Sequence, residues 1–98
     1  GLLAHTARMG ERLLAALQDL ARELPDVVRD VRGRGLMCAF SLPTTADRDA
    51  LLAALWERGV IMLGSGPDSV RFRPALTVTP AELDRAVATV REVLRAAV

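Results

Sequence analysis

A run of leucines at helical spacing opens the chain and constrains its fold more than any other feature. Within residues 2–24, four leucines lie four, three and four residues apart, at Leu13, Leu17, Leu20 and Leu24. This periodicity predicts an amphipathic helix with one face that must be buried. Pro25 ends the predicted helix, because proline lacks the amide hydrogen that another turn would need. The rest of the chain has to supply a surface that covers this leucine stripe.

Two further segments are predicted to be helices, and each begins with residues that typically cap the N-terminus of a helix. Thr44 and Asp47 have capping spacing, and Gly59 is a typical stop, so the sequence predicts a helix with an apolar face made of Leu51, Leu52, Leu55 and Trp56. Thr79, Pro80 and Glu82 predict another start, because threonine caps, proline suits the first turn and glutamate completes the capping box. The buried positions of this last helix are Leu83, Ala86, Val87, Val90 and Leu94.

Apolar runs between the helical segments predict three strands. Residues 36–42 form a run suited to a strand that is buried, or nearly buried, on both faces. Residues 60–63 and 69–72 flank a turn-rich segment, which predicts an antiparallel hairpin. Gly33 and Gly35 precede a strand instead of linking a strand to a helix, so a bulge or close approach is expected there rather than a phosphate cradle. We expect residues 1–98 to form a single small α+β domain, with a three-stranded, mainly antiparallel sheet and helices packed on one face.

The second strand of this hairpin, which starts at Ser69 and is stopped by Pro74, carries the candidate binding residues. Side chains alternate along a strand, so Val70 and Phe72 are expected in the core while Arg71 and Arg73 share the outer face. A guanidinium fits a carboxylate or a phosphate, but two exposed arginines can equally be solvated charge. Arg32 and Arg34 are the other cations that could act on a ligand.

Composition excludes several classes of function. Thirteen basic residues balance twelve acidic ones without a basic stripe, so neither nucleic acid nor a membrane is an expected partner. All thirteen are arginine, and a chain without lysine cannot hold pyridoxal phosphate through a Schiff base. Cys38 and His5 are the only residues of their types, so no metal site is expected. Cys38 has apolar neighbours and should be buried, which fits a reducing, cytoplasmic location. No serine has a recognisable base, so no catalytic residue is predicted.

Two motifs resemble those of a known family. Residues 31–37 (VRGRGLM) and 70–78 (VRFRPALTV), followed by a capped helix, resemble the C-terminal small domain of class III pyridoxal-phosphate aminotransferases. The stretch over residues 34–49 resembles the L-lysine ε-aminotransferases of actinobacteria. The sequence departs from the family pattern at Ala75, where a second proline is usual, and at Gly64, where the lysine enzymes tend to have proline. Ala75 should loosen the turn that follows the arginine strand. Gly64 should make the approach to the active site more mobile.

The resemblance implies a role for the whole chain. Such enzymes are homodimers that transfer the ε-amino group of L-lysine to 2-oxoglutarate, with the catalytic lysine and the cofactor site in a large domain. Arg71 would face the mouth of that site and pair either with a large-domain glutamate or with a substrate carboxylate, and Arg73 would be accessory. The chain itself would bind no cofactor. It starts at Gly1 without an initiator methionine or a helix cap, so we expect it to be part of a longer enzyme.

A second hypothesis belongs to another class of protein. The chain would then be a stand-alone α+β module for carboxylate binding or oligomerisation, with Arg71 and Arg73 capturing a small acid and without catalytic activity. Carboxylate binding by the isolated chain distinguishes this module from a domain whose site is completed elsewhere.

Overall fold

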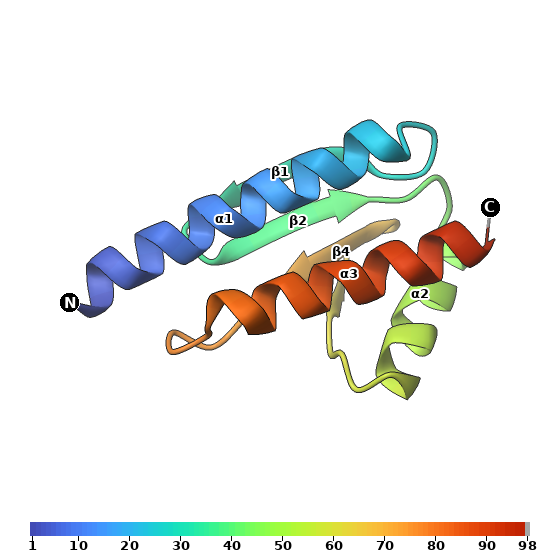
Figure 1. The fold of residues 1–98 in the computed structure, drawn as a ribbon. Coiled ribbons are helices and arrows are strands. Elements are labelled where there is room, and N and C mark those ends of the chain that lie inside the picture. The colour runs from blue at the N-terminus through green and yellow to red at the C-terminus, as the bar shows by residue number, and fades with distance from the viewer. Residues whose placement is uncertain (98) are drawn as a thin grey trace.

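Three helices and four strands make up the computed structural model, which describes residues 1–97 (Figure 1). Their order is α1 (Leu2–Glu23), β1 (Arg29–Arg34), β2 (Met37–Ser41), α2 (Thr45–Glu57), β3 (Leu63–Ser65), β4 (Ser69–Phe72) and α3 (Pro80–Ala97). The predicted α+β class is confirmed.

The strands form one antiparallel sheet in the order β1-β2-β4-β3. The α1 helix packs on β1, β2 and α3, while α2 packs on β3, β4 and α3. All three helices lie on the same side of the sheet, and α1 and α3 run side by side over it (Figure 1). The other face carries none of these helices, and it is this open face that bears the candidate site.

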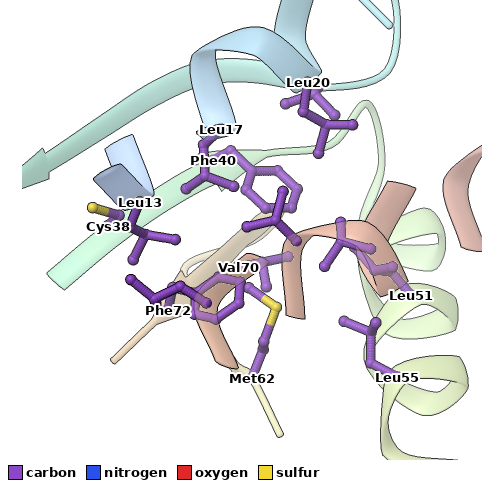
Figure 2. Close-up of a cluster of buried hydrophobic side chains, with 14 of the residues drawn as sticks. Leu13, Leu17, Leu20, Cys38, Phe40, Leu51, Leu55, Met62, Val70 and Phe72 are labelled. Atoms are coloured by element: carbon purple, nitrogen blue, oxygen red, sulfur yellow. The ribbon is translucent and has the colours of Figure 1, made fainter. Parts of the chain in front are cut away.

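The core lies between the helices and the covered face of the sheet. Phe40 of β2 and Val70 of β4 are completely buried, as are the three leucines of the α1 stripe, Leu13, Leu17 and Leu20. Figure 2 shows these side chains directed toward one another, with Leu51 and Leu55 entering from α2. Burial of a side chain of this size contributes about 1.5–3 kcal/mol, so this layer is the main support of the sheet.

Capping explains where two of the helices begin. The Thr44 side chain accepts a hydrogen bond from the Asp47 amide at 3.0 Å, and α2 starts at the next residue. Thr79 and Glu82 exchange hydrogen bonds at the start of α3, as the capping box predicts. Gly59 has a φ of +79° just after α2, which confirms it as the stop.

The main correction concerns β1, a fourth strand that the sequence did not predict. Residues 29–34 pair with β2, and their side chains are nearly all exposed, so no apolar pattern marks them as a strand. The expected tight approach at the glycines is confirmed: Gly35 has a φ of +58° between β1 and β2, and a Cβ at Gly33 would lie 2.5 Å from the Cys38 sulfur.

Two further expectations were wrong in detail, and a third is confirmed. The strand expected over residues 60–63 is β3 at Leu63–Ser65, which leaves only residues 66–68 as the hairpin loop. Trp56, expected in the apolar face of α2, is 67% exposed. Strand β2 is buried on both faces over Cys38, Ala39 and Phe40, as expected, and only its ends are more exposed, with Met37 at 43%.

Candidate carboxylate-binding site

Arg71 lies in the middle of β4, on the open face of the sheet. Its neighbours Val70 and Phe72 are buried among the helices, which confirms the predicted alternation of side chains. In the sheet register Arg71 lies opposite Ala39 of β2 and Leu63 of β3. Directly paired residues project to the same face, so the Arg71 side chain leaves the sheet between these two apolar neighbours.

The Arg71 guanidinium lacks the partner that a half-buried cation normally has. Its Nε atom is buried and has no hydrogen-bond acceptor among residues 1–97. Within the same described residues, no aspartate or glutamate forms an ion pair with it. A buried donor without an acceptor costs about 1–3 kcal/mol.

Arg32 lies on the same face, on the other side of Ala39. Its Nη2 atom donates to the Ser69 hydroxyl at 2.9 Å, and its Nη1 atom donates to the Asp30 carbonyl at 2.8 Å. Arg32 and Arg71 therefore flank Ala39, which is paired with both and only 8% exposed. Sequence reasoning named Arg32 as a candidate cation, but its place in this row depends on β1, which was not predicted.

Arg73 and Arg34 occupy more exposed positions. Arg73 follows the last residue of β4 and lines a shallow depression with Glu82 and Arg85, to which Arg71 does not contribute. Arg34 lies opposite Met37 at the end of β1. The structure thus places Arg71 and Arg32 on the same face, on either side of β2, whereas Arg73 lines a separate depression beside α3.

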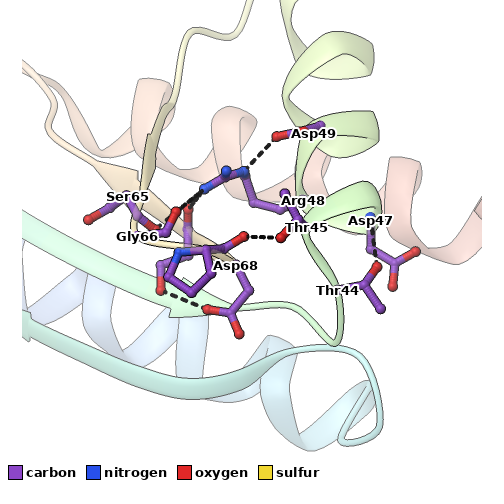
Figure 3. Close-up of polar contacts among 10 residues, drawn as sticks. Thr44, Thr45, Asp47, Arg48, Asp49, Ser65, Gly66 and Asp68 are labelled. Carbon is purple, nitrogen blue, oxygen red and sulfur yellow. Dashed lines mark hydrogen bonds and ion pairs between the residues drawn. The ribbon is translucent and has the colours of Figure 1, made fainter.

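Sequence reasoning missed Arg48, a largely buried arginine next to the β3–β4 turn. Its side chain is only 11% exposed, and its Nη1 atom donates to the Ser69 carbonyl at 2.9 Å (Figure 3). Arg48 stands in the first turn of α2, where an arginine is ordinarily solvated. No local pattern indicates that it faces the hairpin, because the hairpin is distant in the sequence.

The remaining reactive groups have structural roles. The His5 Nε2 atom makes a 2.8 Å hydrogen bond with the Val78 carbonyl oxygen. Cys38 is 1% exposed, and burial raises the pKa of its thiol, so the thiolate is disfavoured. The described residues contain no cluster of three or more histidine, cysteine or acidic side chains that could bind a metal. No helix in this part of the chain has the length and apolarity to span a membrane.

Comparison with known families identifies the family to which this chain belongs. Residues 1–94 match the family model described as aminotransferase class-III. The chain belongs to this family. An L-lysine-epsilon aminotransferase of Mycobacterium tuberculosis is 58% identical over 94 residues, which cover 96% of this chain and 21% of that protein. The enzyme of the same name from Amycolatopsis lactamdurans is 47% identical over 85 residues, covering 86% and 19%.

Solved structures of class III aminotransferases have the same fold. A lysine aminotransferase from M. tuberculosis superposes with a TM-score of 0.97 at 56% identity, over 100% of this chain and 22% of that one. An ornithine aminotransferase from Plasmodium yoelii gives 0.82 at 26% identity, over 96% and 25%. The present chain therefore spans about a fifth of the length of the curated relatives it matches.

Membership of the family implies pyridoxal phosphate in the complete enzyme. The residues of this chain do not fit that cofactor by themselves, because the sequence contains no lysine to form the Schiff base. What the chain does offer is the cationic side chain of Arg71 on an open sheet face.

Proposed function

We propose that this chain is the C-terminal domain of a pyridoxal-phosphate aminotransferase that transfers the ε-amino group of L-lysine to 2-oxoglutarate. The identity of 58% to an L-lysine-epsilon aminotransferase, over nearly the whole chain, supports the choice of amino donor. A mitochondrial 4-aminobutyrate aminotransferase from Mus musculus is 43% identical over 75 residues, which cover 76% of this chain and 15% of that protein. The higher identity and coverage favour lysine over 4-aminobutyrate.

The contribution of this domain is a carboxylate site at Arg71. The observation that carries this proposal is the buried Nε atom of Arg71, which has no acceptor in the described residues and lies on the face that the helices leave open. A guanidinium in such a position forms a charge-assisted hydrogen bond with a carboxylate that approaches from outside. Ala39 and Leu63 flank Arg71 on the two neighbouring strands and reduce its contact with water. The hydrogen bond to the carboxylate is therefore stronger than it would be in bulk water.

One cation can serve two substrates if its partner is exchanged. While the lysine side chain occupies the site, a glutamate from the rest of the enzyme would pair with Arg71 and hide its charge. When 2-oxoglutarate enters, a substrate carboxylate would replace that glutamate. The exchange favours the dicarboxylate without leaving an unpaired charge in the other half-reaction.

The open face of the sheet is the surface for the large domain in this proposal. It combines the cations Arg32 and Arg71 with the exposed apolar side chains Met37 (43%) and Leu63 (49%). Apolar side chains together with arginines are typical of the buried part of an interface. The large domain would provide the catalytic lysine and the cofactor site, and the complete enzyme would be a cytoplasmic homodimer.

Substitution of Arg71 in the full-length enzyme tests the proposed role. We expect Arg71→Ala to lower kcat/KM for 2-oxoglutarate by about 30-fold, which corresponds to the roughly 2 kcal/mol of a charged hydrogen bond. Arg73→Ala should have a smaller effect. Arg8→Ala, which removes an exposed arginine of α1, is the control. Unchanged kinetics of Arg71→Ala with both substrates would exclude the carboxylate role.

A further inference from the structure

Arg48 connects α2 to the hairpin that carries Arg71. Its Nη1 atom donates to three carbonyl oxygens, those of Ser69 at 2.9 Å, Gly66 at 3.3 Å and Ser65 at 3.4 Å (Figure 3). Its Nε atom donates to the Asp49 carboxylate at 2.8 Å. The side chain is 11% exposed, so these acceptors replace most of its hydration.

The three carbonyl groups mark both sides of the β3–β4 turn. Ser65 is the last residue of β3, Gly66 is the first of the loop and Ser69 is the first of β4. The Thr45 hydroxyl adds a further bond, donating to the Pro67 carbonyl at 2.6 Å. The first turn of α2 therefore holds the whole turn through two side chains.

Strand β3 needs this support because it is a short edge strand. It contains three residues and pairs only with β4 in the sheet. Strand β4, in contrast, also pairs with β2 over four residues. A loss of the contacts from α2 would free β3 before it freed β4.

Gly64 provides the space that the Arg48 guanidinium occupies. A Cβ atom at position 64 would lie 3.0 Å from the Arg48 Nη1 atom and 3.2 Å from Cζ. The sequence departs from the family pattern at this position, and greater mobility was expected there. In the structure, the largely buried side chain of Arg48 fills the space beside this glycine.

We propose that Arg48 is a positioning residue for Arg71, acting through the edge strand β3. Leu63 of β3 lies directly opposite Arg71 and forms one of the two walls beside its side chain. By holding the turn, Arg48 keeps this wall in place and limits the directions in which the Arg71 guanidinium can point. The inference rests on the proposed carboxylate role of Arg71 and extends it to a second arginine.

The test compares two arginines of the same helix in the full-length enzyme. We expect Arg48→Met to raise KM for 2-oxoglutarate by about tenfold, because a displaced binding group loses much of its effect. The single-turnover rate with L-lysine should change by less than about twofold. In the proposed exchange, Arg71 pairs with a glutamate of the enzyme, and not with a substrate carboxylate, while L-lysine is bound. Arg58→Met is the matched control, because Arg58 is an exposed residue at the end of α2 that pairs with Glu92.

Two more variants separate positioning from general damage. Arg48→Lys should recover part of the affinity for 2-oxoglutarate, because an ammonium group still donates to the turn carbonyls. Gly64→Ala keeps every hydrogen-bonding group but places a methyl against the guanidinium, so it should give the same selective rise in KM. It also keeps the proposal testable if Arg48→Met does not fold.

The outcomes distinguish this inference from the proposed function. If Arg71→Ala raises KM for 2-oxoglutarate while Arg48→Met or Gly64→Ala leaves it unchanged, the positioning role is wrong and the carboxylate site stands. Equal losses with both substrates would also overturn the positioning role, because they indicate a general loss of structure. If Arg71→Ala itself has no effect, the proposed function fails.

Discussion

Thr79 and Glu82 show how single residues fix the start of α3. The Thr79 hydroxyl accepts from the Glu82 amide at 3.2 Å, and the Glu82 carboxylate accepts from the Thr79 amide at 2.9 Å. We expect Thr79→Ala to lower the free energy of unfolding of the chain by about 1 kcal/mol, measured by urea titration with circular dichroism. Thr77→Ala, which removes an exposed threonine two residues earlier, should be close to neutral. Equal effects of the two variants would contradict the capping role.

The same contact makes stability depend on pH. The hydrogen bond from the Thr79 backbone holds the pKa of Glu82 below its ordinary value, and the Thr79 side chain adds to this effect. Because the pKa of Glu82 is lowered in the folded state, its ionised carboxylate stabilises the fold at pH values above the ordinary carboxyl pKa of about 4. This contribution is lost as the pH falls through the lowered pKa. Glu82→Gln should therefore lose less stability than the wild type between about pH 5 and pH 3. Parallel pH profiles of the two proteins would show that the contact does not stabilise the fold.

Single residues also show which parts of the site the sequence predicts. The alternation of Val70, Arg71 and Phe72 is enough to place Arg71 on the open face, because burial of the two apolar neighbours fixes the orientation of the strand. Arg48 could not be predicted in the same way. Its position depends on carbonyl groups of a turn distant in the sequence, and a solitary arginine in a first turn of a helix looks like a solvated charge.

Packing of α1 against the β1–β2 turn gives a prediction at the level of elements. Gly10 is buried in the middle of α1, and a Cβ there would overlap the Gly35 carbonyl. Alanine normally stabilises a helix relative to glycine, but here we expect Gly10→Ala to lower the free energy of unfolding by about 1–3 kcal/mol. Ala15→Gly, at an exposed position of the same helix, should cost about 1 kcal/mol through propensity alone. A stabilised Gly10→Ala protein would contradict the close approach of α1 to the turn.

The helices could be predicted far better than the strands. Leucine spacing and capping residues mark α1, α2 and α3, since both signals arise within a few residues of sequence. Strand β1 has almost no apolar side chains and is held by pairing with β2, so the chain carries no local sign of it. Strand β3 begins three residues later than expected, because its position depends on the pairing of Leu63 with Arg71.

At the level of the whole molecule, our proposal makes this chain one part of a binding site that the rest of the enzyme completes. It spans about a fifth of the related enzymes, and Arg32 and Arg71 lie on the sheet face that its own helices leave open. We therefore expect the 98-residue chain alone to bind 2-oxoglutarate too weakly for calorimetric detection at millimolar concentration, because nothing encloses the ligand. Micromolar binding by the isolated chain would instead favour the stand-alone carboxylate-binding module.

The central claim is that Arg71 receives a substrate carboxylate from the rest of the enzyme. The most direct measurement is a crystal structure of the full-length enzyme with a bound dicarboxylate such as 2-oxoglutarate. Our account predicts a carboxylate oxygen about 2.7–2.9 Å from a guanidinium nitrogen of Arg71. A bound dicarboxylate with both carboxylates held by other residues, and with Arg71 directed away from it, would contradict the account.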